Sequence, residues 1–297
     1  MTERLADISA RVDGVRQLGA VVNAMRGIAA ARVQQARAQV VAVDAYAATI
    51  TGAMGRALAL IPLVAPKGVA PEAARRSSRL ALVLFCAEQG FAGAFSERVL
   101  ETAGADLTGS DVFLIGTRGA TVASGRGVTV NWESALPSHS PGIPKLADRI
   151  VEALYPRIAT GEIGRLDVIV SEWRAGHGTL VKRRRLFPFD MTRFPTPATA
   201  STPLLNLARD MLLNELAADY LHALLCNAAL HAFAAENETR MEAMAAAHNQ
   251  IERQLSALQA TQRHVRQEEI TAEIIELAAG ETASRPDHHR LHQPASR

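Results

Sequence analysis

The stretch from Pro203 to Pro286 constrains this chain most, because it contains no internal proline and no glycine before Gly280. Such a run predicts one very long helix, since proline and glycine are the residues that break or weaken helices. At about 1.5 Å per residue, the helix would extend on the order of 110 Å. A rod of that length cannot bury its own apolar positions, so it needs a partner. We expect Thr202 to cap this helix, with Pro203 at its first helical position.

The two ends of the chain share one hydrophobic pattern. From residue 241 to 265, and again from residue 8 to 54, apolar side chains recur at alternating spacings of three and four, which is typical of a coiled-coil seam. Arg26, His248 and Gln262 interrupt the seam, and polar residues at such positions can fix the alignment of two helices. Since the intervening segment is long enough to form a domain, the pattern predicts that the terminal helices return antiparallel.

Between the two helices the pattern changes to short apolar runs. Three runs have the length of strands, at residues 79–86, 111–116 and 165–170, and a helical pattern at 144–159 precedes the third. Strands that alternate with helices predict a small Rossmann-like α/β domain, with parallel strands. Residues 179–187 alternate in polarity, so we expect an edge strand there.

The predicted fold class is therefore α/β plus a long antiparallel coiled coil. Gly52 and Gly55 are expected to fray the end of the first helix. The expected segments are a coiled-coil helix at 1–58, a proline-rich linker at 59–78, the α/β domain at 79–202, a second coiled-coil helix at 203–280 and a disordered tail at 281–297.

Composition narrows the class of protein. Apolar residues make up 48% of the chain and the mean hydropathy is +0.04, values typical of a globular protein. We expect no membrane span, because no apolar run reaches about eighteen residues, and no secretory signal, because the first residues are charged. Cys86 and Cys226 are expected to be reduced core residues. The formal charge of +2 does not indicate a nucleic-acid partner.

Glycine-containing turns at residues 90–93 and 116–119 follow predicted strands, where a dinucleotide-binding loop would lie. Neither turn has the GxGxxG spacing, and the chain contains no GK[ST] sequence. Because tight turns between a strand and a helix need glycine without any ligand, we expect no bound nucleotide or other cofactor.

Two further groups of residues could bind ions. The basic run Lys182–Arg185 could bind phosphate, but on an edge strand such residues more often prevent pairing with another chain, and we favour that interpretation. The histidines of the tail, His288, His289 and His292, have no cysteine or carboxylate cluster to complete a metal shell, so we expect no metal site. The sequence shows no catalytic residues.

Motifs at both ends of the chain carry a family resemblance. Residues 11–15 (RVDGV) and 23–32 (NAMRGIAAAR) are similar to RI-x-S-V followed by KAMKMVAASK. Residues 240–244 (RMEAM) and 266–280 (RQEEITAEIIELAAG) are similar to ARM-x-AM and ARQ-x-x-IT-x-EL-x-EI-x-x-G. The turn at residues 86–96 (CAEQGFAGAFS) resembles SDRGLCGGFN. Together these motifs resemble those of the gamma chain of F-type ATP synthases, the central shaft of a rotary motor.

The resemblance implies that the paired helices thread a ring of alternating alpha and beta chains, with one copy of this chain per complex. It implies that the α/β domain meets an epsilon chain and the membrane ring of c chains, on the cytoplasmic face of the bacterial plasma membrane. Ion flow would turn the shaft and drive catalysis in the beta chains, while this chain would perform no bond chemistry. The resemblance places six residues against the beta chains: Met25, Arg26, Arg266, Gln267, Thr271 and Glu273.

Some residues depart from the family pattern. Gly27 replaces a methionine beside Arg26, and Glu268 with Glu269 adds negative charge at a contact that is usually neutral. These departures indicate a divergent branch of the family, such as one that serves an alternative ATPase. Two alternatives stay open from the residues alone: a coiled-coil tether or adaptor with an α/β head, and a nucleotide-dependent enzyme, which the missing phosphate loop disfavours.

Overall fold

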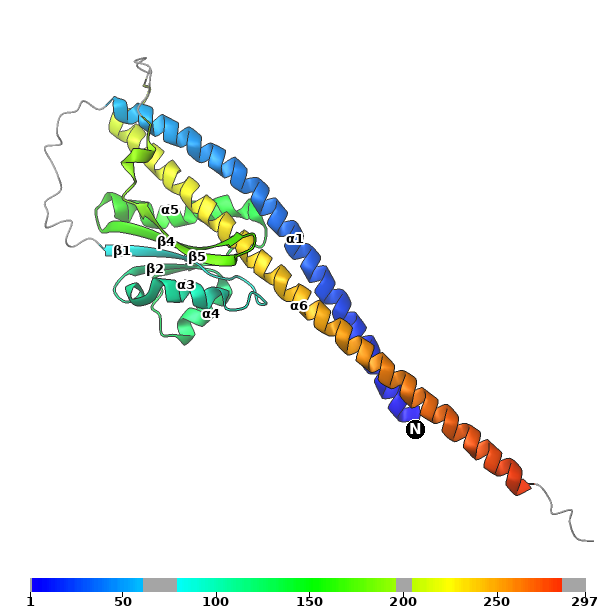
Figure 1. The fold of residues 1–297 in the computed structure, drawn as a ribbon. Coiled ribbons are helices and arrows are strands. Elements are labelled where there is room, and N and C mark those ends of the chain that lie inside the picture. The colour runs from blue at the N-terminus through cyan, green and yellow to red at the C-terminus, as the bar shows by residue number, and fades with distance from the viewer. Residues whose placement is uncertain (1, 61–78, 196–204, 285–297) are drawn as a thin grey trace, which may run out of the picture. The chain divides into compact units, whose positions relative to one another are not determined.

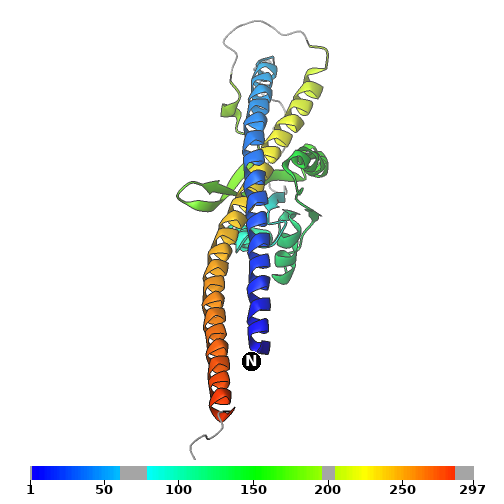
Figure 2. The same cartoon turned by 90° about the vertical axis from the view of Figure 1, so that its right-hand side faces the viewer.

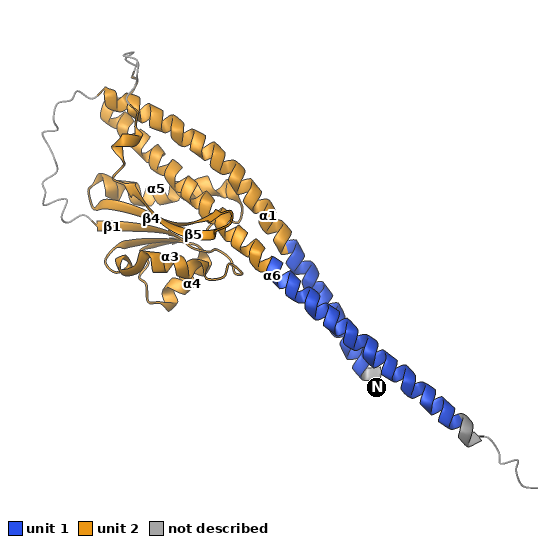
Figure 3. Cartoon of the chain, viewed as in Figure 1, with its two compact units in different colours: residues 1–24, 245–297 blue, residues 25–244 orange. Residues whose placement is uncertain are grey.

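A computed structural model describes most of the chain. The described residues are 2–60, 79–195 and 205–284. They fall into two compact units, and each unit contains part of both long helices (Figure 3). The first unit comprises residues 1–24 and 245–297, and the second comprises residues 25–244. The two helices are α1 (Thr2–Ala59) and α6 (Arg209–Ser284).

In the first unit the helices pack against each other as an antiparallel pair. Ile8 and Val12 of α1 form a buried cluster with Val265 of α6. Further along α1, Gly19 lies beside Ile251, whose side chain would be 3.3 Å from a Cβ at that glycine. As residue numbers increase along α1, the numbers of their partners on α6 decrease, which confirms the predicted antiparallel coiled coil.

The same direction holds in the second unit. Arg37 of α1 pairs with Glu238 of α6 at 2.5 Å, and Asp44 accepts a hydrogen bond from Asn227 at 2.7 Å. From the first pair to the second, the residue number increases by seven on α1 and decreases by eleven on α6. Charged and amide groups join the helices here, beside an apolar seam that includes Ala36.

The segment between the helices forms a five-stranded sheet of order β3-β2-β1-β4-β5. The pairs β1–β2, β1–β4 and β2–β3 are parallel, whereas β5 is antiparallel to β4 and forms an edge, as predicted. In Figure 2 the turn between β4 and β5, drawn in green, projects to the side of the helices. The strands are β1 (Arg79–Phe85), β2 (Asp111–Ile115), β3 (Trp132–Ser134), β4 (Ile163–Arg174) and β5 (Gly178–Phe187).

Helices cover both faces of this sheet (Figure 1). Val83 and Phe85 of β1 join the core on the side of α1, α5 and α6, and Leu82 with Leu84 joins the core on the side of α3 and α4. Because successive side chains of a strand point to opposite faces, a strand buried on both faces must be apolar throughout. The covering helices are α3 (Phe95–Ala103), α4 (Thr117–Gly125) and α5 (Ile143–Ala159). Short 3-10 turns lie at Gly104–Leu107, Ser140–Gly142 and Met191–Arg193.

The prediction for the ends of the long C-terminal helix was wrong. Helix α6 begins at Arg209, so Thr202 and Pro203, which lie outside the described residues, cannot cap it. An acidic residue in the first turn, Asp210, favours this later start because it interacts with the positive end of the helix dipole. The helix also passes through Gly280 to Ser284 instead of ending there, since one exposed glycine costs only about 1 kcal/mol.

The glycines near the end of α1 do not fray it. Gly52 and Gly55 both lie within the helix, which continues to Ala59. A Cβ at Gly55 would lie 2.2 Å from the backbone oxygen of Pro195. Glycine is needed there so that the segment after β5 can pass close to the helix, a contact that only the tertiary structure creates.

Candidate functional site: a strand-end turn and an exposed helix surface

The segment after β1 forms a turn at the carboxyl end of a central parallel strand, where ligands bind in sheets of this type. Phe91 lies at its tip with φ of 61° and a side chain that is 66% exposed. The backbone N–H groups of Glu88 and Gln89 donate to the two carboxylate oxygens of Glu236 on α6, at 3.2 and 3.1 Å. The turn is therefore attached to the long helix through a carboxylate.

A buried arginine completes this attachment. Arg240 donates to Glu236 at 2.5 Å and also to the backbone oxygen of Gly90 at 3.3 Å. Both side chains are almost fully buried, with Glu236 2% and Arg240 4% exposed. A buried pair of this kind is tolerated only when further hydrogen bonds compensate the loss of water. The turn supplies those hydrogen bonds. The Glu236–Arg240 ion pair therefore connects helix α6 to the α/β domain.

A second carboxylate occupies the neighbouring strand end. Glu88 accepts hydrogen bonds from the backbone N–H and the hydroxyl of Thr117, at 3.0 and 2.8 Å, and from the backbone N–H of Leu136 at 2.8 Å. Thr117 begins helix α4, and a helix N-terminus after a strand is where an α/β domain binds phosphate. Carboxylates of the chain itself thus occupy both positions, and their negative charge disfavours a bound phosphate.

One feature of the sequence indicates this buried network. Residues 236–240 (ENETR) interrupt an apolar part of the long helix, yet Glu236, Asn237, Glu238 and Arg240 are all buried. A run of polar residues in a stretch that is otherwise buried indicates partners elsewhere in the fold. The local pattern does not identify the partners of Glu236 and Arg240 in the turn after β1, because they lie about 150 residues away in sequence.

The last part of α6 presents the opposite kind of surface. Four of the residues predicted to contact the beta chains, Arg266, Gln267, Thr271 and Glu273, are exposed on it. The hydroxyl of Thr271 donates to the backbone oxygen of Gln267 at 2.8 Å. These side chains are therefore accessible to a partner.

Large apolar side chains accompany them. Ile270, Ile274, Ile275 and Leu277 are between 50% and 69% exposed. A cluster of exposed apolar residues on one helix is typical of a surface that another protein covers. The sequence motif contains these residues, but only the structure shows that the chain's own helices leave them exposed.

The other two predicted contact residues, Met25 and Arg26, lie on α1 in the second unit. Both are half-buried, and the next seam position, Ala29, is fully buried. Gly27 beside them has nothing within 4 Å of the position of a Cβ, so the replacement of the family's methionine leaves open space there. The six predicted residues thus form two groups, one in each unit.

One polar seam residue, Gln262, forms a hydrogen bond between the two helices, as predicted. Gln262 is half-buried in the coiled coil of the first unit, and its amide donates to the hydroxyl of Ser9 at 2.9 Å. The Ser9 hydroxyl in turn donates to the backbone oxygen of Leu5. The hydrogen bond links the two helices at one position, which favours a single register.

The basic edge strand is bonded to its neighbour. Lys182 and Arg184 both bond the carboxylate of Glu172 on β4. Arg183 bonds Asp167 at 2.7 Å, and burial alone would raise the pKa of that carboxyl, but hydrogen bonds from arginines outweigh burial and lower it. Ion pairs across the two strands therefore hold these cations, while their predicted role in preventing pairing with another chain stays a prediction.

The other candidate features from the sequence are the tail histidines, a metal site and a membrane span. His288, His289 and His292 lie outside the described residues. Within residues 2–60, 79–195 and 205–284, no group of acidic, histidine and cysteine side chains is arranged to hold a metal ion. Across the same ranges, none of the helices combines the length and the apolar character that a membrane crossing requires.

Both cysteines are free and buried, as predicted. Burial raises the pKa of the Cys86 thiol to about 12, and burial likewise raises the pKa of Cys226 to about 12. Such thiols stay protonated at neutral pH and are poor nucleophiles. They serve the packing of the core.

Comparison with known proteins agrees with this architecture. The family described as ATP synthase matches residues 4–283. The chain is 26% identical to the ATP synthase gamma chain of Frankia casuarinae, over 95% of this chain and 98% of that protein. It is 27% identical to the ATP synthase gamma chain of Chlorobium luteolum, over 94% of this chain and 98% of that protein.

Solved structures show the same fold. The chain resembles a chain of the Euglena gracilis mitochondrial ATP synthase in rotational state 3, with a TM-score of 0.65, 14% identity and full coverage of both chains. A chain of the rotor of that synthase in rotational state 1 gives a TM-score of 0.61 at 13% identity, and it covers 91% of this chain and 100% of that one. With the family model matched over nearly the whole sequence and the fold shared with a rotor, the chain belongs to the ATP synthase family.

Proposed function

We propose that this chain is the gamma subunit of an F-type ATP synthase or ATPase, the shaft that transmits rotation between a membrane c-ring and a hexamer of alpha and beta chains. The observation that carries the proposal is the match to relatives named ATP synthase gamma chain over 94–95% of the sequence. The paired terminal helices and the exposed apolar surface at the end of α6 support it, because a shaft must offer a surface to a surrounding ring.

The chain itself performs no bond chemistry in this proposal, and catalysis belongs to the beta chains. Support comes from the strand ends of the α/β domain, where the carboxylates of Glu236 and Glu88 take the hydrogen bonds that a phosphate would need. An epsilon chain would be a further partner. As part of the complex, the chain would lie peripherally on the cytoplasmic face of a bacterial plasma membrane.

Six residues are proposed to contact the beta chains. The exposed group on α6 offers a cation, an amide and a carboxylate beside apolar side chains, which suits a contact that must form and break during rotation. Met25 and Arg26 on α1 offer a flexible apolar side chain and a guanidinium. The proposed contacts are Met25, Arg26, Arg266, Gln267, Thr271 and Glu273.

The test is to co-express the cognate alpha and beta chains with and without this chain, and to measure complex composition and ATP hydrolysis. A stable three-to-three-to-one complex whose turnover requires this chain is the expected result. If alpha and beta assemble and turn over alike without it, the shaft function fails and a coiled-coil tether takes its place. Hydrolysis by the isolated chain would contradict the assignment of catalysis to the beta chains.

The contact residues are tested in the same complex. Replacing Arg266 and Gln267 with alanine should reduce ATP-driven ion pumping more than it reduces the stability of the chain, because both side chains are exposed. Arg253→Ala is the matched control, since Arg253 is exposed on the same helix and bonds only Gln250 among the described contacts. Equal losses of pumping in the test and control variants would contradict the proposed contacts of Arg266 and Gln267 with the beta chains.

A further inference from the structure

A polar pocket lies within the second unit, between the edge strand β5, the segment that follows it and helix α6. Its volume is about 690 Å³, within the range of small-molecule sites. Arg184 and Arg185 of β5 line it together with Arg193 of the following 3-10 turn, and Tyr220 and Asn227 of α6 form the opposite wall. The side chain of Arg185 reaches Asp167 on the other face of the strand, so the guanidinium groups of Arg184 and Arg193 are the ones on the pocket side, and Asp190 also lines the cavity.

The first of these charges is only partly compensated. Arg184 bonds the carboxylate of Glu172, but the same carboxylate also accepts a hydrogen bond from Lys182 at 2.6 Å. Burial and the charge of Arg193 lower the pKa of Arg184. One carboxylate therefore serves two cations, and the charge of Arg193 also acts on Arg184.

The second pocket arginine, Arg193, has only a distant carboxylate. Arg193 lies 3.8 Å from Asp190, whose carboxylate accepts hydrogen bonds from the backbone N–H and the hydroxyl of Thr192. Arg193 is 65% exposed and can turn toward a ligand. Donors of the Arg193 guanidinium are therefore available to a ligand.

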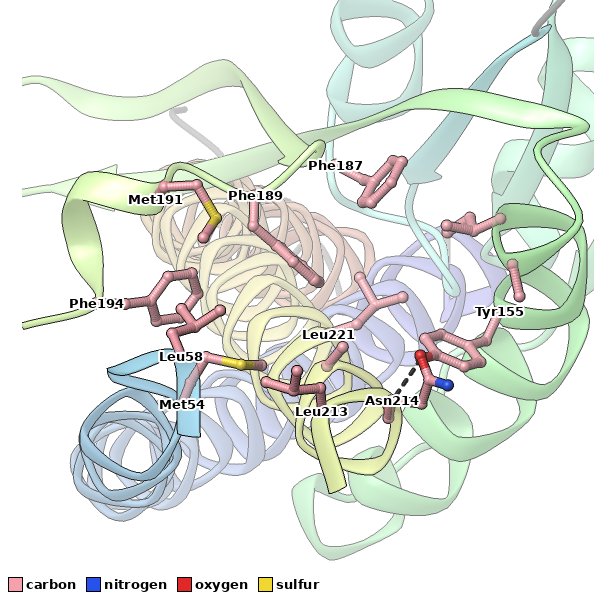
Figure 4. A pocket seen from close by; sticks show the side chains of 13 residues that line it. Met54, Leu58, Tyr155, Phe187, Phe189, Met191, Phe194, Leu213, Asn214 and Leu221 are labelled. Atoms are coloured by element: carbon pink, nitrogen blue, oxygen red, sulfur yellow. Dashed lines mark hydrogen bonds between the residues drawn. The ribbon is translucent and has the colours of Figure 1, made fainter. Parts of the chain in front are cut away.

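An apolar pocket of about 450 Å³ shares a wall with this one. Phe189 lines both pockets. Figure 4 shows Met191 and Phe194 beside Phe189, with Leu213 and Leu221 of α6 also lining the apolar pocket. A basic pocket and an apolar pocket thus lie on the two sides of one aromatic side chain.

We propose that the basic pocket binds a phosphate-bearing anion through Arg184 and Arg193. The planar fork of a guanidinium matches two oxygens of a phosphate, and two such forks favour phosphate over a monovalent anion. The phosphate could be free in solution or the headgroup of an anionic lipid, whose acyl chain would enter the apolar pocket past Phe189. The site goes beyond the proposed rotary function and does not depend on it.

The first arm of the test uses pyrophosphate as a compact anion. The purified full chain is titrated by calorimetry, and saturable binding at one site per chain is expected. Arg193→Gln should weaken it by about tenfold, the effect of losing one charge-assisted hydrogen bond. Arg193→Lys, which keeps the charge but loses the fork, should also weaken it. Arg126→Gln is the control, because it removes one charge from the distant α4 side, where Arg126 pairs with Glu101.

The second arm measures flotation of the full chain with vesicles of phosphatidylglycerol or of phosphatidylcholine. Binding to the anionic vesicles alone, lost in Arg193→Gln and in Met191→Gln but kept in Arg126→Gln, identifies a lipid headgroup as the source. Met191 is exposed at the rim of the apolar pocket, so its replacement spares the fold and should leave pyrophosphate binding unchanged.

Either arm can support the site, and both together can overturn it. Pyrophosphate binding that depends on Arg193 with no vesicle binding identifies a free phosphate. If neither probe binds saturably, or if Arg126→Gln weakens binding as much as Arg193→Gln, the pocket is not a site and the attraction is general electrostatics. Circular dichroism of each variant establishes that the fold is retained.

Discussion

Two regions of helix α6 differ in where their contacts come from. Residues 232–244 are largely buried, and Glu236, Glu238 and Arg240 among them bond the turn after β1 and helix α1. Residues 266–280 are almost all exposed, and they include large apolar side chains. The first region is completed by its own chain, whereas the second is not. One continuous helix thus combines an internal attachment with a surface suited to another protein.

The largest expected effect concerns the internal attachment. Glu236→Ala should lower the free energy of unfolding by about 3–5 kcal/mol, because it leaves Arg240 buried without its partner and two backbone N–H groups of the turn unpaired. Chemical denaturation of the full chain measures it. The control is Glu252→Ala at an exposed position of the same helix, which should change stability by no more than about 0.5 kcal/mol. A loss below that size in Glu236→Ala would show that the attachment does not stabilise the fold.

The next effect concerns the buried thiols of the same unit. Their pKa values are raised to about 12 in the folded state, above the ordinary value near 9. Below pH 9 both states hold the proton and stability is unaffected. Above it the unfolded thiols ionise while the folded ones do not, so stability should fall by up to about 1.4 kcal/mol per pH unit for each thiol.

Denaturation between pH 8 and pH 11 measures this slope. The variant with Cys86→Ala and Cys226→Ala, although less stable throughout, should show a shallower fall. Equal slopes in the two proteins would mean that water reaches the thiols, and that the internal region is less closed than the structure indicates.

A smaller effect is expected in the first unit, which contains both the coiled coil and the exposed surface. Gln262→Ala removes a hydrogen bond to the Ser9 hydroxyl and should cost about 1 kcal/mol. Thermal unfolding of the full chain measures it, and Gln250→Ala at an exposed position of the same helix is the control. A Ser9→Ala change added to Gln262→Ala should cost little more, because the interaction is already lost. Full additivity would show that the two side chains do not interact in solution.

The smallest effect on the chain itself belongs to the exposed surface. Ile274→Ser and Leu277→Ser together should change the stability of the full chain by less than about 0.5 kcal/mol per site, since both side chains are exposed. The same pair should weaken assembly with the alpha and beta chains, measured by size exclusion of the co-expressed complex. Unchanged assembly would show that this exposed surface does not bind the alpha and beta chains.

The pattern of the sequence was sufficient for the coiled coil and for the class of the central domain. Period-3.5 spacing, strand-length apolar runs and the polar alternation of residues 179–187 each depend on local neighbours, so they can be recognised without coordinates. The start of α6 was less predictable: a Thr-Pro pair is a strong local signal, yet Arg209 begins the helix. The three-residue strand β3 was too short to produce a pattern.

Chain order and spacing by themselves determined that this protein has two long paired helices around an α/β domain, and the motifs determined the family that the helices resemble. Only the tertiary structure decided which charges are buried together. Glu236 and Arg240 become a buried pair because a turn about 150 residues earlier supplies their remaining hydrogen bonds. Gly55 is likewise required by the passage of Pro195, and Arg184 and Arg193 line one pocket only because β5 and the segment after it meet α6. Local periodicity reports which side of an element is covered, whereas the identity of the covering group depends on contacts between segments distant in sequence.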